Sequence, residues 1–339
     1  MKSVIKQIAV LLLIAHVVVA FDVQTLVPAP APARWLGLIG EYGTDKEIFY
    51  ILEKDGNLCA SFKRAEPEPL REISRNVFAF TGATQLSGER LVFTRDRTGR
   101  ATQVTVLNVP LKRRRIEPEA GANQLRVPPV RPVAELLKEA LAAQPPPESG
   151  DFLKAELVEL IKLDPTIRLD VRYATTNNLF GTVFYSQPRA FMQRPAAEAL
   201  VRVSSNLKKY GYGLLVHDAY RPWYVTKVFW DATPADKKIF VADPAKGSRH
   251  NRSCAVDITL YDLKTKKPVE MVSTYDETTD RAYPNYPGGT SLQRWHRDLL
   301  RKAMEAEGFT VYEAEWWHFD YKDWQKYPIM NVRFEQIGN

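Results

Sequence analysis

The 339-residue sequence contains only two cysteines and, after its first twenty residues, no long hydrophobic run. Cys59 and Cys254 lie one in each half of the chain. An oxidising compartment would permit a disulfide between them, but two cysteines so far apart do not specify one. No pattern recurs with a period of 20–50 residues, which excludes repeat architectures. With 45% hydrophobic and 26% charged residues the chain is typical of globular protein, and its length suits two domains better than one.

The first twenty residues have the pattern of a secretory signal peptide. Lys2 and Lys6 precede an apolar run from Ile8 to Val19, and Ala20 is the small residue expected at the cleavage site. The run is too short to span a bilayer comfortably, and no cysteine follows it to carry a lipid anchor. We therefore expect an exported protein, periplasmic or secreted, without a membrane span. A buried N-terminal core segment is the alternative.

The charge of the chain is mildly basic. Removal of residues 1–20 would lower the net charge from +7 to +5. An exported basic protein is attracted to an anionic cell wall or outer surface, whereas nucleic acid is the wrong partner for that compartment. The basic run Lys112-Arg113-Arg114-Arg115 is interpreted as a solvated charge cluster at a domain edge, with a site for an anionic polymer as the alternative.

The N-terminal half predicts a small all-β domain. Residues 21–33 are rich in Pro and Ala and predict an extended leader. Within residues 34–117, one hairpin is indicated about the turn 55–57 and another about the turn 97–99, its second strand running to Val109. They favour a small antiparallel barrel or sheet, which carries no constellation of catalytic residues. A Pro-rich linker with a short helix follows over residues 118–150.

Residues 151–339 predict an α+β domain with a central antiparallel sheet flanked by helices. Apolar residues at helical spacing indicate one helix that Pro195 begins and Gly211 ends, and another that Ser291 caps and Gly308 ends. The residues of the second helix expected to face inward are Leu292, Trp295, Leu299 and Met304. Three apolar stretches predict strands, at 212–219, 309–313 and 316–321.

The segment around His250 and Asp257 carries two groups that can bind a metal ion. From Ala255 the sequence alternates as a strand, with Val256 and Ile258 on the core face and Asp257 on the other face. His250 lies just upstream, in a polar loop that can fold back beside Asp257. One imidazole and one carboxylate make two-thirds of a catalytic zinc site. A hydrogen-bonded loop histidine and a turn-capping aspartate are the alternatives.

Two other segments supply the remaining groups of such a site. Catalytic zinc takes three protein ligands, with a carboxylate nearby as general base, so His318 can be the third ligand and Glu315 the base. Residues three apart face opposite sides of a straight strand, so Glu315 must lie at a bend or at the start of a strand. Arg221, at a strand end before Pro222, is a natural stabiliser of the oxyanion formed when an amide is hydrolysed.

These segments together resemble the D-alanyl-D-alanine dipeptidases of the vancomycin-resistance type. Those enzymes belong to the LAS metallopeptidases, which share a fold with the Hedgehog signalling domain. The resemblance covers roughly residues 155–330 and rests on four segments: Ser248-x-His250-x6-Asp257, Glu315-Trp316-Trp317-His318, 171–178 and 211–222.

The resemblance implies both the reaction and the roles of residues. It implies one zinc ion per chain and hydrolysis of the D-alanyl-D-alanine dipeptide to two D-alanines. The roles it implies are metal ligation by His250, Asp257 and His318, general base catalysis by Glu315, and oxyanion stabilisation by Arg221.

The resemblance also implies how the substrate is bound. Asp276 occupies the place of a carboxylate that binds the free ammonium of the substrate, and Tyr173 and Ser248 are further candidates for pocket contacts. Ser253 departs from the family, which usually has Gly there. If the position needs a positive φ, Ser costs about 1 kcal/mol or more.

Two alternatives remain open. One is a D,D-carboxypeptidase or peptidoglycan peptidase acting on longer stems, and the closure of the pocket around Asp276 decides between the two enzymes. The other is a wall-binding module with a degenerate metal site, against which the presence of both Glu315 and Arg221 argues. Export would separate the enzyme from cytosolic synthesis of D-alanyl-D-alanine, which favours scavenging of wall dipeptide over antibiotic resistance.

Overall fold

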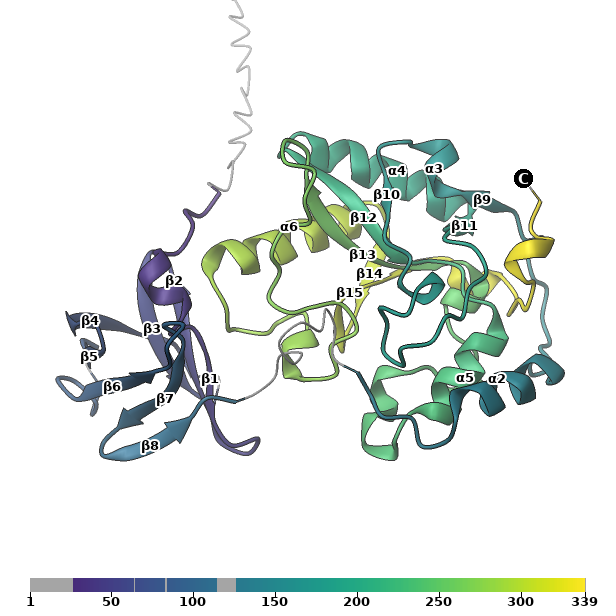
Figure 1. The fold of residues 1–339 in the computed structure, drawn as a ribbon. Helices are drawn as coiled ribbons and strands as arrows, with labels where there is room; N and C mark the ends of the chain where they lie inside the picture. The colour runs from purple at the N-terminus through teal and green to yellow at the C-terminus, as the bar shows by residue number, and fades with distance from the viewer. Residues whose placement is uncertain (1–26, 64, 83, 115–125, 339) are drawn as a thin grey trace, which may run out of the picture.

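The computed structural model describes residues 27–63, 65–82, 84–114 and 126–338. The expected signal peptide and the first part of the leader lie outside these residues. Among the described residues, no helix has the length and apolar character needed to cross a membrane. The chain folds into an N-terminal all-β unit and a C-terminal α/β unit that lie side by side (Figure 1). Cys59 and Cys254 are both buried and free.

The N-terminal unit is a meander of eight antiparallel strands, each paired with the next. After helix α1 (Ala33–Leu36), the strands are β1 (Gly40–Gly43), β2 (Ile48–Lys54), β3 (Asn57–Phe62), β4 (Glu68–Ser74), β5 (Val77–Phe80), β6 (Arg90–Arg95), β7 (Ala101–Val106) and β8 (Val109–Lys112). Two-residue turns with positive φ, Asp55-Gly56 and Leu107-Asn108, match the twist of the strands they join. The second turn divides the strand that was expected to run to Val109, so that prediction was wrong at its end.

The last strand of the meander returns to the first. Tyr42 in β1 bridges to Arg113, and the N–H of Arg114 donates to the carbonyl of Glu41 at 2.9 Å. The guanidinium of Arg113 donates to the hydroxyl of Tyr42 and to the carbonyl of Ile39, and Arg114 pairs with Glu41. The prediction of a solvated charge cluster is therefore wrong for Arg113 and Arg114. Closure of the barrel packs their side chains against β1.

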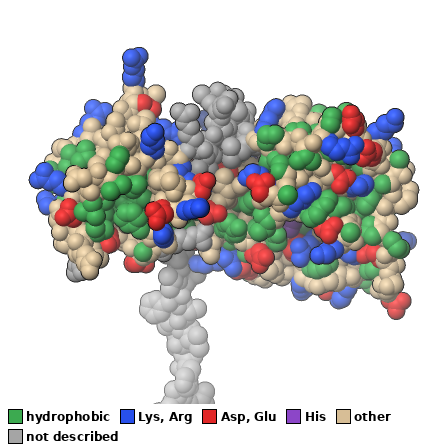
Figure 2. Space-filling view, turned by 90° about the horizontal axis from the view of Figure 1, so that it is seen from below, with side chains coloured by type: hydrophobic (Ala, Val, Ile, Leu, Met, Phe, Trp, Pro, Cys, Tyr) green, Lys and Arg blue, Asp and Glu red, His purple; other side chains and the backbone are tan. Residues whose placement is uncertain are grey.

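The charged side chains do not form one patch on the visible face of the molecule. Figure 2 shows Lys and Arg spread over both units, with Asp and Glu among them. This face therefore offers no continuous basic surface to an anionic polymer.

Strand β2 packs against both units, so both of its faces are buried. Its residues alternate between two cores, with Phe49 and Ile51 inside the β unit and Ile48, Tyr50 and Leu52 in the core of the C-terminal unit. A strand buried on both faces reads as a continuous apolar run, which is the pattern of the sequence here. The β unit is thus docked on its neighbour through a shared core.

Glu53, at the end of β2, fixes this docking. Its carboxylate is 1% exposed and accepts hydrogen bonds from the N–H groups of Ser291, in the first turn of helix α6 (Ser291–Ala306), and of Gly56, both at 2.7 Å. Arg294 donates to the carbonyl of Glu53 at 2.6 Å. A carboxylate in this position satisfies free N–H groups of the helix and interacts favourably with its dipole.

The C-terminal unit is built on a five-stranded sheet in the order β10–β12–β13–β15–β14. Its strands are β10 (Arg168–Leu169), β12 (Tyr212–Asp218), β13 (Ala255–Asp262), β14 (Phe309–Tyr312) and β15 (Glu315–Tyr321), and a separate pair consists of β9 (Leu157–Glu159) and β11 (Phe191–Gln193). The sheet was expected to be antiparallel. It is so except at its edge, where the short β10 runs parallel to β12.

Helices cover both sides of this sheet (Figure 1). They are α2 (Val133–Ala142), α3 (Leu160–Leu163), α4 (Arg194–Lys208), α5 (Trp223–Ala232) and α6, with 3-10 turns η1 (Arg172–Ala174), η2 (Ala235–Phe240), η3 (His250–Arg252), η4 (Asp280–Ala282), η5 (Trp324–Lys326) and η6 (Phe334–Gln336). Helices α4 and α6 lie together on one face, and α5 lies on the other with α2 against it.

Helix α6 differs in detail from its prediction. Its N-cap is Thr290, which forms a capping box with Gln293 and leaves Ser291 to bind Glu53. The fully buried apolar residues are Leu300 and Met304, whereas the expected inward residues Leu292, Trp295 and Leu299 are half-buried. The contact with the β unit at the first turn was not visible in the sequence, and it fixes which side of the helix faces the sheet.

We predict that Glu53→Ala lowers the free energy of unfolding by about 2–4 kcal/mol, because it leaves the buried N–H and hydroxyl of Ser291, at the start of α6, without their charged acceptor. Urea unfolding of the purified protein measures this. The control is Glu66→Ala, which removes only the exposed ion pair with Lys54 and should change stability by less than about 1 kcal/mol. Equal, small effects of the two variants would contradict the docking role of Glu53.

Candidate metal centre and active site

Three neighbouring strands place three polar side chains in one row. The pairing of β12, β13 and β15 sets Asp218 opposite Asp257, and Asp257 opposite His318. Asp257 lies on the face opposite to Val256 and Ile258, as the alternation predicts. Both faces of β13 are nevertheless buried, and Asp257 is only 2% exposed. The row therefore forms the floor of an enclosed site.

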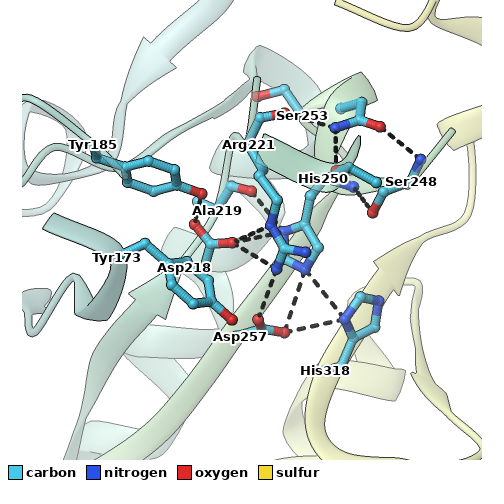
Figure 3. Close-up of polar contacts among 12 residues, drawn as sticks. Tyr173, Tyr185, Asp218, Ala219, Arg221, Ser248, His250, Ser253, Asp257 and His318 are labelled. Carbon is cyan, nitrogen blue, oxygen red and sulfur yellow. Dashed lines mark hydrogen bonds and ion pairs between the residues drawn. The ribbon is translucent and has the colours of Figure 1, made fainter. Parts of the chain in front are cut away.

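His250, from the turn η3, points its imidazole at this row (Figure 3). Its Nε2 lies 3.2 Å from Nδ1 of His318 and 3.4 Å from Oδ1 of Asp257, and Nδ1 of His318 lies 3.0 Å from the same oxygen. Bonds of ~2.1 Å to zinc at tetrahedral angles place ligand atoms about 3.4 Å apart. Asp257 Oδ1 is buried and accepts no hydrogen bond from the described part of the chain. The three atoms thus fit one metal ion.

The other ring nitrogen of each histidine is held by an acceptor. Nδ1 of His250 lies 2.6 Å from the carbonyl oxygen of Ala219, and Nε2 of His318 lies 3.0 Å from Oδ1 of Asp320. Because these oxygens only accept, each ring carries a proton there and can present a lone pair at its inner nitrogen. Burial alone would lower the pKa of His318, but Asp320 and Asp257 raise it to about 10. The same carboxylates would attract a metal cation to this point.

Ser253 ends the turn η3 between His250 and Asp257. Its φ of 58° and ψ of 31° are left-handed, so this position does have the conformation that favours Gly. The expected cost is about 1 kcal/mol. The hydroxyl of Ser253 donates to the carbonyl of Phe191 at 3.0 Å, and such a bond contributes about 1 kcal/mol. The backbone strain expected at Ser253 is therefore present, and the hydrogen bond from its hydroxyl offsets it.

Glu315 lies where the proposed base has to lie. It is the first residue of β15 and pairs with Tyr312 after a shift in the β14–β15 register, which is the strand start that the sequence required. Its Oε2 lies 3.7 Å from Nδ1 of His318. Burial raises the pKa of Glu315 to about 8, although His318 lowers it. Glu315 is beside the metal-binding atoms but outside the group of three that converges on one point.

Arg221, just after β12, is held rigidly at the edge of the row. Its Nε and Nη2 both lie 2.9 Å from Oδ2 of Asp218. Its guanidinium lies over the rings of Tyr173 and Phe229, at 5.2 and 5.0 Å. The residue is 8% exposed, so its charge acts in a medium with little water.

The three candidate substrate contacts lie in the same cavity as the metal ligands. The cavity measures about 100 Å³, and its walls include Asp276, Tyr173 and Ser248. The hydroxyl of Tyr173 donates to Asp276 at 2.9 Å, and Ser248 Oγ accepts from the N–H of His250 at 3.2 Å. Burial raises the pKa of Asp276 to about 7, and the carboxylate of Asp257 adds to this rise.

Four residues of the site had no role in the sequence analysis: the buried Asp218, Tyr185 and Tyr275 and the half-buried Asp320. Asp320 could have been found, since it stands two residues after His318 and so on the same face of the strand. Tyr185 and Tyr275 reach the site from loops, donating to Asp218 at 2.7 Å and to Asp257 at 3.0 Å. No spacing in the sequence indicates contacts between such distant segments.

Two imidazoles and one carboxylate are a ligand set of catalytic zinc sites. Three protein ligands leave the fourth coordination position for the reacting groups. With a carboxylate base beside them, these residues define a metal-dependent hydrolase.

Comparison with known proteins places the chain within this class. Residues 153–337 match the sequence profile of the D-ala-D-ala dipeptidase family, a family of metallopeptidases, and the chain belongs to it. It is 31% identical over 179 residues to the D-alanyl-D-alanine dipeptidase of Escherichia coli K12, covering 53% of this chain and 91% of that protein. It is 33% identical over 186 residues to the enzyme of the same name from Enterococcus faecalis V583, covering 50% and 92%. The β unit lies outside the family match.

We predict that Glu315→Gln retains the metal but lowers kcat by at least about 100-fold, because an amide cannot accept the proton that a general base removes. Metal content by elemental analysis and steady-state kinetics test this. Glu313→Gln, two residues away and exposed, is the matched control and should behave as wild type. Loss of the metal from the Glu315 variant would instead make Glu315 a ligand.

Proposed function

We propose that the protein is a zinc dipeptidase that hydrolyses D-alanyl-D-alanine to two D-alanines. Membership of the family supports the class of reaction, and the names of the relatives support this substrate. The observation that carries the proposal is the presence of Asp276 in the same small cavity as the metal-binding triad.

The size of the cavity favours a dipeptide over a longer stem. Its volume of about 100 Å³ is well below the roughly 300 Å³ at which sites for drug-sized ligands begin. Asp276 is half-buried in its wall, so a substrate whose amino group binds there would have its N-terminus at that point. A D,D-carboxypeptidase needs room for the rest of the peptide beyond this residue. A wall-binding module would need neither Glu315 nor Arg221, and both are in place.

The residues of the site would divide the work as follows. His250, Asp257 and His318 would hold the zinc ion, which would supply Lewis acidity for hydrolysis of the scissile amide. The Glu315 carboxylate removes a proton from the attacking water and returns it to the leaving amino group. The guanidinium of Arg221 stabilises negative charge on the tetrahedral carbon's oxygen.

The reaction is tested by measuring zinc content and the release of alanine from D-alanyl-D-alanine. N-acetylated D-alanyl-D-alanine and L-alanyl-L-alanine are the controls, and both should be poor substrates. Cleavage of pentapeptide stems at the same rate as the free dipeptide would replace the dipeptidase by a carboxypeptidase. A protein that binds zinc but releases no alanine from any of these would favour the binding module.

Asp276 is expected to recognise the free ammonium of the substrate. A charge-assisted contact left unmade in a closed site costs on the order of 2–5 kcal/mol. We therefore predict that Asp276→Ala lowers kcat/KM for the free dipeptide by ~30-fold or more. On the N-acetylated dipeptide the same variant should have almost no effect. Asp280→Asn, four residues further and exposed, is the control. Equal losses on both substrates would contradict the role in amine recognition.

We also propose that the enzyme is exported, to the periplasm or beyond, and acts in turnover of cell-wall peptide. The support is the pattern of Lys2, Lys6 and the apolar run that ends at Ala20. Sequencing the N-terminus of protein expressed from the full gene tests this, and a chain that still begins at Met1 would contradict it. The five-stranded sheet with α4 and α6 on one face supports assigning the unit to the fold shared with the Hedgehog signalling domain.

A further inference from the structure

Tyr275 touches the metal site without belonging to the ligands, the base or the oxyanion group. Its hydroxyl lies 3.0 Å from Oδ2 of Asp257 and 3.1 Å from the hydroxyl of Tyr173. It stands in the loop that follows β13, one residue before Asp276, and is 4% exposed. A buried hydroxyl this close to a ligand carboxylate decides how that carboxylate is oriented.

The direction of its hydrogen bond follows from counting protons. Tyr173 has one hydroxyl proton, and Asp276 accepts it at 2.9 Å. The hydroxyl of Tyr275 also has a single proton, so it can donate one hydrogen bond, either to Asp257 or to the oxygen of Tyr173. An ionised carboxylate is the stronger acceptor, so the hydroxyl of Tyr275 donates its hydrogen bond to Asp257. Asp257 and Asp276 then each accept one hydrogen bond from a tyrosine hydroxyl.

This bond makes the two oxygens of Asp257 unequal. Oδ1 faces the inner nitrogens of His250 and His318 and accepts no hydrogen bond from the described residues. Oδ2 accepts from Tyr275, while Nη2 of Arg221 is 3.8 Å away, beyond hydrogen-bond distance. A rotation of the carboxylate that brought both oxygens to the metal would break the bond to Tyr275.

The ring of Tyr275 is clamped so that its hydroxyl cannot swing away. It stacks on the imidazole of His217 with centroids 4.6 Å apart and planes at 25°, and the ring of Trp317 meets it edge-on at 5.6 Å. His217 precedes Asp218 in β12, and Trp317 precedes His318 in β15. The clamp is therefore built on the strands that carry the row itself, and its geometry follows theirs.

We propose that Tyr275 is a positioning residue that holds Asp257 in the orientation of a single-oxygen metal ligand. The proposal rests on the proposed metal site. Residues that hydrogen-bond to metal ligands fix the orientation of those ligands, and their loss commonly lowers metal affinity by about 10–100-fold. Tyr173, although it touches Tyr275, acts on Asp276 and thus on the substrate.

The test is the zinc dissociation constant of three full-length variants, measured by competition with a chromogenic chelator. Tyr275→Phe keeps the clamped ring and removes only the hydroxyl, so the dissociation constant should rise about 10-fold or more. Tyr261→Phe is the matched control, since it also removes a buried hydroxyl, bonded to the carbonyl of Thr166, from the strand that carries Asp257. Tyr173→Phe separates the two roles. Both of these variants should bind zinc within about twofold of wild type.

A dissociation constant unchanged in Tyr275→Phe would overturn the proposal. So would equal weakening in all three variants, because that would show general loosening of the core. Kinetics give a second readout at saturating zinc, where Tyr275→Phe should lower kcat with little change in KM and Tyr173→Phe should mainly raise KM. Zinc affinity needs no substrate. A wild-type protein that releases no alanine would therefore defeat the proposed function and leave the role of Tyr275 to be decided by the binding measurements.

Discussion

The pairing of strands β12, β13 and β15 is the constraint on which the site depends. It sets Asp218, Asp257 and His318 side by side across the sheet. Side chains alternate between the faces of a strand, so a slip of one residue in β13 would turn Asp257 toward the helices and bring Val256 or Ile258 into the site. The apolar residues packed under α4 and α6 oppose such a slip. The core of the C-terminal unit thereby fixes the position of a candidate metal ligand.

The N-terminal unit takes part in that same core. Strand β2 contributes Ile48, Tyr50 and Leu52 to it, and Glu53 binds the first turn of α6, the helix that packs on β13, β14 and β15. Displacing the β unit would uncover apolar side chains and buried N–H groups at once. The unit that lies outside the family match is therefore part of the structure that supports the site.

The sequence predicted those parts of the site that lie within one segment or on one strand. The ligand residues, Glu315 at a strand start, and the face occupied by Asp257 follow from local alternation and from the chemistry of the side chains. The sequence left open whether Ser253 needs a positive φ, and the structure gives it one. What could not be predicted depends on packing between distant segments. The contact of β2 with α6, the arginines folded across β1, and Tyr275 beside Asp257 leave no periodic signal in the chain.

The balance of charge explains why these residues belong together. Asp218, Asp257, Asp276 and Glu315 place four carboxyl groups in or beside one small cavity, where the guanidinium of Arg221 forms ion pairs with Asp218 and Asp257. Burial raises the pKa of Asp276 to about 7 and of Glu315 to about 8, and repulsion from the neighbouring carboxylates adds to both rises. Two cations would relieve this repulsion, one among His250, Asp257 and His318 and one at Asp276. Under the proposed function, a divalent metal and the ammonium of a free dipeptide would supply these two cations. The metal ion and the ammonium group would then balance the same set of carboxylates, which would couple metal binding to recognition of the substrate's amino group.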